Sequence, residues 1–234
     1  ASAADSIDVR SVSTNTVMTA QEIQRLPLAR TAESIALLAP GAVAGNPVFF
    51  GSAVSLGGAS VAENAYYING FFTGNPMTNV GGYTLPYGSI EQQETYTGGY
   101  SAKYGRSDGG VLNQIGKSGS NDFHFGAQVT WTPRGLRAGT PDRHLPNDAL
   151  PEGYAYQDDT LVGRLFSRGD RNESWGETYS AYVSGPLLRD RLFGFVSLEQ
   201  ERTETKAYPT VLGVPQSLHD TTKNPKLYAK LNWN

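Results

Sequence analysis

The 234-residue sequence contains no cysteine. This absence excludes a disulfide scaffold, an iron–sulfur centre, a thiol nucleophile and any zinc site with cysteine ligands. The sequence also lacks an excess of basic side chains, because 19 Lys and Arg stand against 22 Asp and Glu and leave a net charge of −3. Since nucleic-acid binding normally requires a basic stripe, we expect no nucleic-acid partner.

Long apolar runs are absent as well. No stretch of about 18 apolar residues occurs, which excludes a transmembrane helix. Membrane-spanning β-strands remain compatible with the sequence, because their apolar and polar residues alternate. Of the 27 glycines, 17 lie between Gly41 and Gly119, and Glu63 is the single charged residue between positions 34 and 90. Since apolar clusters interrupt this stretch, we expect a compact unit with tight turns rather than disorder.

Two short helices and about four short strands are predicted up to residue 121. Thr19 and Glu22 have the spacing of a capping box, which predicts a helix that ends before Pro27. A second helix is expected from about 31 to 38. The candidate strands are 53–56, 65–69, 89–97 and 111–117. We assign this α+β unit to residues 19–121, after an N-terminal extension of residues 1–18.

Residues 122–234 follow a different pattern, in which apolar and polar side chains alternate along each strand. About forty residues separate the first two predicted strands, a tight turn at 186–190 joins the next pair, and roughly twenty-five residues follow the third. Alternating long and short connections are typical of an outer-membrane barrel, although a soluble β-sandwich also fits the alternation. The predicted strands are 123–132, 179–185, 192–200 and 227–233.

Five segments resemble TonB-dependent outer-membrane receptors of the Oar-like branch, and they occur along the chain in the same order as in that branch. Residues 90–113 resemble the plug signature, residues 117–124 the plug-to-barrel junction, and residues 184–193 the first periplasmic turn. Residues 26–30 together with 38–41, and residues 63–70, match the same branch. The resemblance implies an α+β plug followed by antiparallel strands of a transmembrane β-barrel, of which residues 122–234 would hold about four.

The resemblance has two departures. Gln93 and Thr95 stand where the family usually has apolar residues, so we expect a more polar strand there. A plugged barrel of this kind has about 22 strands, which needs far more chain than 234 residues. The first residues also show no signal-peptide pattern. We therefore expect the chain to be an N-terminal piece of a longer receptor.

The function implied by the resemblance is TonB-dependent active transport of a large solute across the bacterial outer membrane, with the plug gating the barrel. The cargo would be a peptide, an oligosaccharide or a siderophore. The implied partners are the periplasmic domain of TonB in the TonB–ExbB–ExbD system, outer-membrane lipid and an external ligand. The plug would lie in the barrel lumen and the N-terminus in the periplasm. The alternative is a surface or adhesion protein with a plugged barrel that transports nothing.

Two groups of site residues follow from the resemblance. Asp5, Ile7 and Val9 are typical of a TonB box, the strand that pairs with TonB by β-augmentation. The alternative is that the box lies upstream and that these residues belong to a linker. Arg106 is assigned to lock the plug by pairing with a carboxylate of the barrel wall, and its alternative role is that of a solvated turn residue.

The apical plug loops, residues 48–51 and 71–87, form the candidate ligand surface. Aromatic and amide side chains suit peptides or sugars, through stacking and hydrogen bonds. Phe71 and Phe72 belong to the same stretch, but packing inside the plug is the simpler interpretation for them. The residues predicted to face the ligand are Asn75, Asn79, Tyr83 and Tyr87.

No catalytic or metal-binding pattern is present in the sequence. His124, His144 and His219 are scattered, and the pair Asp158-Asp159 is typical of a solvated loop rather than a calcium site. No Gly-x-Ser-x-Gly motif occurs. We therefore expect no enzymatic activity, no metal and no cofactor.

Overall fold

The computed structural model describes residues 13–45, 53–105, 107–136, 141, 143–144, 165–211 and 214–234. The chain divides into two compact units. Unit 1 comprises Ala1–Phe125, Tyr182–Ser197 and Leu227–Asn234, and unit 2 comprises Gly126–Ala181 and Leu198–Lys226. None of the helices among the described residues is long and apolar enough to cross a membrane.

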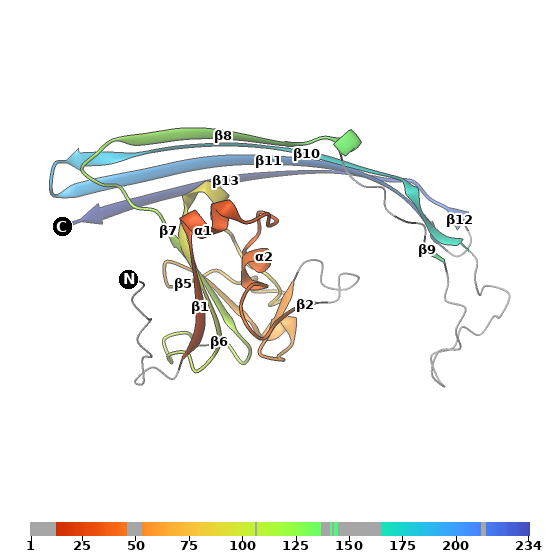
Figure 1. Ribbon diagram of the computed structural model, residues 1–234, viewed down its shortest axis with the longest axis horizontal. Helices are drawn as coiled ribbons and strands as arrows, with labels where there is room; N and C mark the ends of the chain where they lie inside the picture. The colour runs from red at the N-terminus through yellow and green to blue at the C-terminus, as the bar shows by residue number, and fades with distance from the viewer. Residues whose placement is uncertain are drawn as a thin grey trace, which may run out of the picture. The chain divides into compact units, whose positions relative to one another are not determined.

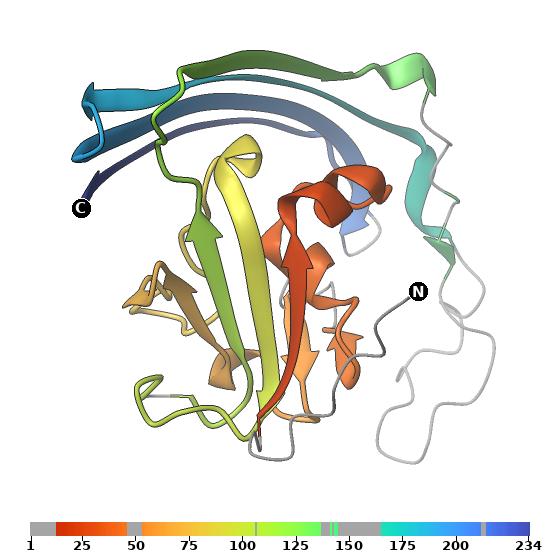
Figure 2. The same cartoon turned by 60° about the vertical axis from the view of Figure 1, so that its left-hand side comes forward.

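A five-stranded sheet forms the centre of unit 1, in the order β1-β6-β7-β4-β5. The strand β4 runs parallel to β7, and the other neighbours are antiparallel. Figure 2 shows β1, β6 and β7 side by side. A separate antiparallel pair is formed by β2 (Ala42–Ala44) and β3 (Val54–Leu56). The sheet strands are β1 (Thr14–Thr19), β4 (Ala65–Ile68), β5 (Phe71–Phe72), β6 (Ile90–Gly98) and β7 (Val111–Gly116).

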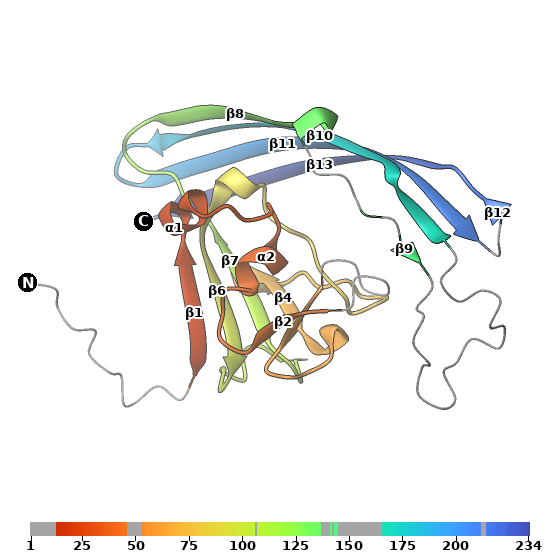
Figure 3. The same cartoon turned by 45° about the vertical axis from the view of Figure 1, so that its right-hand side comes forward.

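Both predicted helices are confirmed. The helix α1 (Ala20–Arg25) follows directly on β1 (Figure 3), and its capping box is complete. The Glu22 carboxylate accepts from the Thr19 amide at 2.8 Å, while the Thr19 hydroxyl accepts from the Glu22 amide at 3.4 Å. The helix α2 (Ala32–Ala36) begins at Thr31, whose hydroxyl accepts from the Ser34 amide at 3.2 Å. Three 3₁₀ turns complete the helical elements, namely η1 (Val61–Glu63), η2 (Tyr87–Ser89) and η3 (Arg134–Leu136).

The four predicted plug strands are confirmed as β3, β4, β6 and β7, and the structure adds β1, β2 and β5. One face of the sheet packs against α2 and β3. The apolar cluster there consists of Ala32, Ala36, Val54, Leu56, Tyr66 and Leu112. The opposite face carries a cluster of Ala65, Tyr67, Tyr104 and Val111, with Tyr96 and Tyr100 packed against it.

Four long strands form a second, open sheet in the order β11-β10-β8, with β13 paired to β11 (Figure 1). Its strands are β8 (His124–Thr132), β10 (Leu165–Leu188), β11 (Leu192–Val211) and β13 (Leu218–Trp233). The short strands β9 (Arg143–His144) and β12 (Val214–Pro215) pair with β10 and β11. The described strands do not close into a barrel.

The predicted strands coincide with parts of these four, and the structure extends β10, β11 and β13 beyond them. The connection between β8 and β10 is therefore limited to residues 133–164, and the one between β11 and β13 to residues 212–217, which is much shorter than the twenty-five residues expected. Pro186 belongs to β10, and the turn lies at Arg189–Arg191 with Asp190 at φ 61°. The residues that the structure adds to these strands include charged side chains, which interrupt the alternation used for the prediction. They still form strands, because the hydrogen bonds of a ladder join main-chain groups and do not require alternating side chains.

Candidate functional site

The loop between β5 and η2 has a defined shape. The Asn75 side-chain oxygen accepts from the Met77 amide at 2.9 Å and the Thr78 amide at 3.3 Å, and an isolated bridge joins Gly74 to Gly82. Asn79 adopts a left-handed conformation with φ 54°. Asn75, which was predicted to face a ligand, therefore uses its side-chain oxygen to shape the loop.

The two predicted tyrosines of this loop differ in exposure. Tyr83 is 80% exposed and its side chain is accessible. Tyr87 is half-buried; its hydroxyl donates to the Ile23 carbonyl at 3.4 Å, and the Arg30 guanidinium lies 4.6 Å from its ring centroid. Burial raises the pKa of Tyr87 despite the opposing charge of Arg30, so the phenol stays protonated and able to donate. Phe71, expected to pack inside the plug, is largely exposed.

Several predicted site residues lie outside the described residues. These are Asp5, Ile7 and Val9 of the proposed TonB box, the lock residue Arg106, and the loop 48–51. Their predicted roles stay predictions.

The strand β1, which follows the proposed box, is an edge strand of the plug sheet. It pairs with β6 from Thr14↔Gly98 to Thr19↔Gln92, and β6 is its only neighbour in the strand order of that sheet. Most of its side chains are exposed, including Val17. Detaching β1 therefore breaks one ladder and leaves the pairing of β6, β7 and β4 in place.

Buried amides connect the plug sheet to α2, at the position where the family usually has an apolar residue. Gln93 is fully buried and donates through Nε2 to the Ala32 carbonyl at 2.8 Å. Its Oε1 accepts from Gln114 Nε2 at 3.0 Å, and Gln114 Oε1 accepts from the Leu85 amide at 3.2 Å. The chain of bonds satisfies each of these groups, which explains how a polar strand is tolerated in the core.

Replacing Gln93 by Ala should destabilise the plug by about 1–3 kcal/mol, because it removes the buried hydrogen bonds to the Ala32 carbonyl and from the Gln114 side-chain amide. Urea unfolding of the intact protein, followed by hydrogen exchange in β6 and α2, measures the change. The control is Gln92→Ala at the neighbouring, less buried position. Equal effects at both positions would contradict the role given to this network.

A carboxylate lies on the opposite face of the same strand. Glu94 accepts from Asn113 Nδ2 at 2.9 Å, from the Tyr96 hydroxyl at 3.2 Å and from Gln92 Nε2 at 3.2 Å. Burial, the hydrogen bonds with Tyr104 and Glu94, and the nearby negative charge raise the pKa of Tyr96 well above its ordinary value. The phenol therefore remains a donor to Glu94 throughout the physiological range.

An aromatic anchor joins the plug helices to the long strands within unit 1. The Phe195 ring of β11 lies 5.8 Å from the Tyr182 ring of β10 and 5.9 Å from the Tyr228 ring of β13. Two of these rings, Phe195 and Tyr228, are buried with apolar side chains of α1, α2 and the segment before β6. The anchor cluster consists of Ile23, Ile35, Leu85, Ile90, Phe195 and Tyr228.

Polar contacts reinforce the anchor at the tip of the β4–β5 hairpin. Asn69 and Gly70 both have positive φ, 51° and 82°, as a two-residue type I′ turn requires. The Asn69 amide donates to the Tyr228 hydroxyl at 3.1 Å and accepts from the Gly116 amide at 3.0 Å. Lys230 Nζ then donates to the Gly116 carbonyl at 3.1 Å. The Asn-Gly pair is a hairpin signal in the sequence, but nothing local indicates its partners on β13.

The described residues hold no group of three or more His, Asp or Glu that could bind a metal ion. The described residues instead provide an edge strand, an exposed loop held by hydrogen bonds, and an α+β unit attached to the long strands by aromatic rings and hydrogen bonds.

An α+β unit attached to long antiparallel strands is the architecture of outer-membrane receptors. Comparison with known proteins agrees with this class. Residues 8–111 match the family model described as TonB-dependent Receptor Plug Domain. Over 198 residues, or 81% of this chain, the sequence is 32% identical to the TonB-dependent transporter Oar of Myxococcus xanthus. The chain belongs to the TonB-dependent receptors. It spans 17% of the length of that relative.

Two solved structures share the fold. The outer membrane transporter YddB from Escherichia coli aligns with a TM-score of 0.64 and 17% identity over 94% of this chain and 31% of its own. The FpvA structure of Pseudomonas aeruginosa, bound to heterologous pyoverdines, aligns with a TM-score of 0.51 and 14% identity over 95% of this chain and 32% of its own. Oar and YddB are both named as transporters.

Proposed function

We propose that this chain gates the TonB-dependent active transport of a large solute across the bacterial outer membrane. The observation that carries the proposal is the plug domain of residues 8–111, whose edge strand β1 comes directly after the proposed TonB box. The plug would lie in the barrel lumen with the N-terminus in the periplasm. The cargo would be a peptide, an oligosaccharide or a siderophore.

The edge position of β1 supports a mechanism. TonB pairs with the strand around Asp5, Ile7 and Val9 by main-chain hydrogen bonds. Tension on this strand detaches β1 from β6 first, because that single ladder connects it to the sheet. The anchor cluster holds α1 and α2 to the long strands, so the rest of the plug resists displacement. Ligand binding outside shifts the population in which the N-terminal strand is released.

The exposed loop supports a ligand site at Tyr83. Replacing Tyr83 by Ala should weaken ligand binding by about tenfold, because an exposed aromatic contact is worth about 0.5–1.5 kcal/mol. Plug stability should not change, since the ring is 80% exposed. The matched control is Tyr87→Phe, which removes only the hydroxyl bonded to the Ile23 carbonyl. Calorimetric titration of the intact receptor measures both, and an unchanged affinity in Tyr83→Ala would remove Tyr83 from the site.

The box assignment is tested by deletion. Removing residues 5–9 from the intact receptor should abolish capture by a purified periplasmic domain of TonB, and ligand binding should remain. Undiminished capture would place the box upstream of Asp5.

Energy dependence tests the function as a whole. Uptake of a bound ligand into cells should stop when the proton gradient is collapsed, while ligand binding to the cell surface persists. Uptake that continues without the gradient contradicts active transport. Binding without any uptake, with or without the gradient, identifies the surface or adhesion protein that is the alternative.

A further inference from the structure

One face of the unit 2 strands carries large exposed side chains. Side chains alternate along a strand, so Val129 and Trp131 of β8 share a face. On β11, Leu198 is exposed whereas its neighbours Ser197 and Glu199 are buried. Trp175 of β10 lies on this same face, because it lines one cavity together with Trp131. We call this face the outer face of unit 2.

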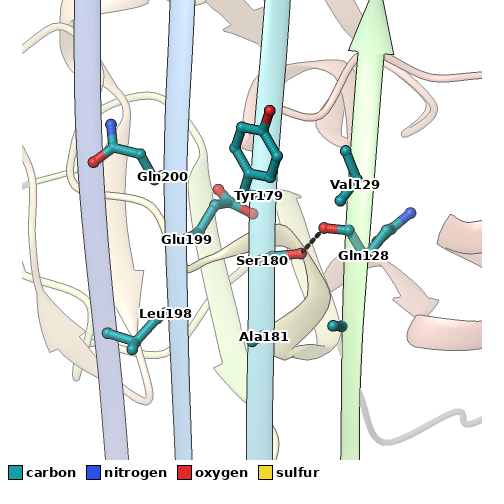
Figure 4. A pocket seen from close by; sticks show the side chains of 9 residues that line it. Gln128, Val129, Tyr179, Ser180, Ala181, Leu198, Glu199 and Gln200 are labelled. Carbon is teal, nitrogen blue, oxygen red and sulfur yellow. Dashed lines mark hydrogen bonds between the residues drawn. The ribbon is translucent and has the colours of Figure 1, made fainter.

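The outer face contains a shallow apolar cavity of about 400 Å³ (Figure 4). Small side chains, Ala127 of β8 and Ala181 of β10, leave the space that larger neighbours surround. The neighbours that line it include Val129, Tyr179 and Leu198. A cavity with this lining suits an acyl chain.

A second cavity of about 340 Å³ is lined by Trp131, Pro133, Arg134 and Trp175. The Arg202 guanidinium lies 5.2 Å from the Trp175 ring centroid. This cavity therefore combines two indole rings with the cationic side chain of Arg202. The strand residues next to it are charged, whereas those around the first cavity are mostly apolar.

Ion pairs surround this second cavity. Arg134 lies 2.9 Å from the Glu173 carboxylate and 3.4 Å from the Glu204 carboxylate. His219 Nε2 lies 3.0 Å from Glu204, and Lys206 Nζ lies 4.0 Å from Glu173. Arg202, in turn, lies 3.9 Å from the Glu177 carboxylate. Since three Arg and Lys side chains face three carboxylates, the cavity has no net attraction for an anion such as phosphate. It offers closely spaced donors and acceptors beside aromatic rings, which suits the hydroxyls and the apolar ring face of a sugar.

We propose that the two cavities together bind a glycolipid of the surrounding leaflet, with its sugar headgroup between Trp131 and Trp175 and an acyl chain in the apolar cavity. The assignment rests on the proposed outer-membrane location. Position along β8 supports this occupant, because Ala127 and Val129 precede Trp131 and the ion-paired Arg134 follows it. An apolar stretch, then indole rings, then charges is the order that an amphiphile meets at a membrane surface.

The test measures lipid retention by the intact protein purified in detergent. A monoglucosyl diacylglycerol is compared with a phosphatidylcholine of the same acyl chains, and native mass spectrometry counts the lipids retained. The wild type should retain the glycolipid about fivefold better, which corresponds to one aromatic stacking contact. Trp131→Ala and Trp175→Ala should each remove that preference.

Trp233→Ala is the matched control, because Trp233 is 70% exposed on β13 and Trp131 is 69% exposed on β8. It should retain the preference. Equal retention of both lipids by the wild type, an unchanged preference in the Trp131 variant, or an equal loss in the control would each overturn the assignment. Membrane fractionation tests the location separately, since a protein found elsewhere fails the proposed function whatever its lipid preference.

Discussion

Replacing Phe195 by Ala should detach the plug helices from the long strands. The Phe195 side chain is 2% exposed and lies between the rings of Tyr182 and Tyr228. Removing a buried aromatic ring of this kind costs about 3–5 kcal/mol. The free energy of local opening determines the rate of hydrogen exchange, so amides of α1 should exchange about 150-fold to 4000-fold faster. Hydrogen-exchange mass spectrometry of the intact protein measures this acceleration.

The matched control for Phe195 is its neighbour. Val196 points to the opposite face of β11 and is 41% exposed, so Val196→Ala should change α1 exchange by less than about threefold. If the Phe195 variant left exchange in α1 unaltered, the anchor cluster would not be what holds the plug.

Replacing Gly110 by Ala should disrupt the plug core. A Cβ at this position would overlap the Leu56 side chain and lie 2.8 Å from the Tyr96 carbonyl oxygen. The Gly110 amide is also tied to Asn64 Oδ1 at 2.9 Å, so the main chain cannot move aside without losing that bond. We expect a loss of about 3 kcal/mol, at the upper end for overpacking. Urea unfolding with hydrogen exchange in β3 and β7 measures it.

Gly98 is the control for Gly110, because a Cβ built there meets no atom within 4 Å. Gly98→Ala should leave plug stability within about 0.5 kcal/mol of the wild type. Comparable losses in both variants would mean that backbone freedom, rather than the space beside Leu56, determines the effect.

The elements that the sequence predicted are those set by local chemistry. The capping box of Thr19 and Glu22 begins α1, and Thr31 begins α2, because these side chains bond to amides three residues away. The predicted strand β4 is a short apolar run between Asn64 and Asn69, and β7 begins directly after Gly109-Gly110. Because such signals act within a few residues, they can be recognised in a single sequence without knowledge of distant contacts.

What the sequence did not predict depends on distant partners. The long strand β10 carries Glu173 and Glu177, which pair with Arg134 of η3 and Arg202 of β11. Apolar and polar residues do not alternate in that part of β10. Its strand conformation depends on pairing with the neighbouring strands rather than on a pattern in its own sequence. Asn69 and Tyr228 meet although 159 positions separate them. For the same reason Tyr83 and Tyr87, which look alike in the sequence, differ in exposure because only Tyr87 packs on α1.

A reversible lock between β1 and β6 tests the central claim most directly. The natural chain has no cysteine, so Thr16→Cys with Thr95→Cys introduces one pair at positions that face each other in the β1–β6 ladder. A disulfide there would prevent β1 from leaving β6. The account predicts that oxidised cells bind ligand normally but take it up at least about tenfold more slowly, and that a reductant restores uptake. Full uptake by the oxidised, cross-linked receptor would contradict the account, because the edge strand would then not need to detach.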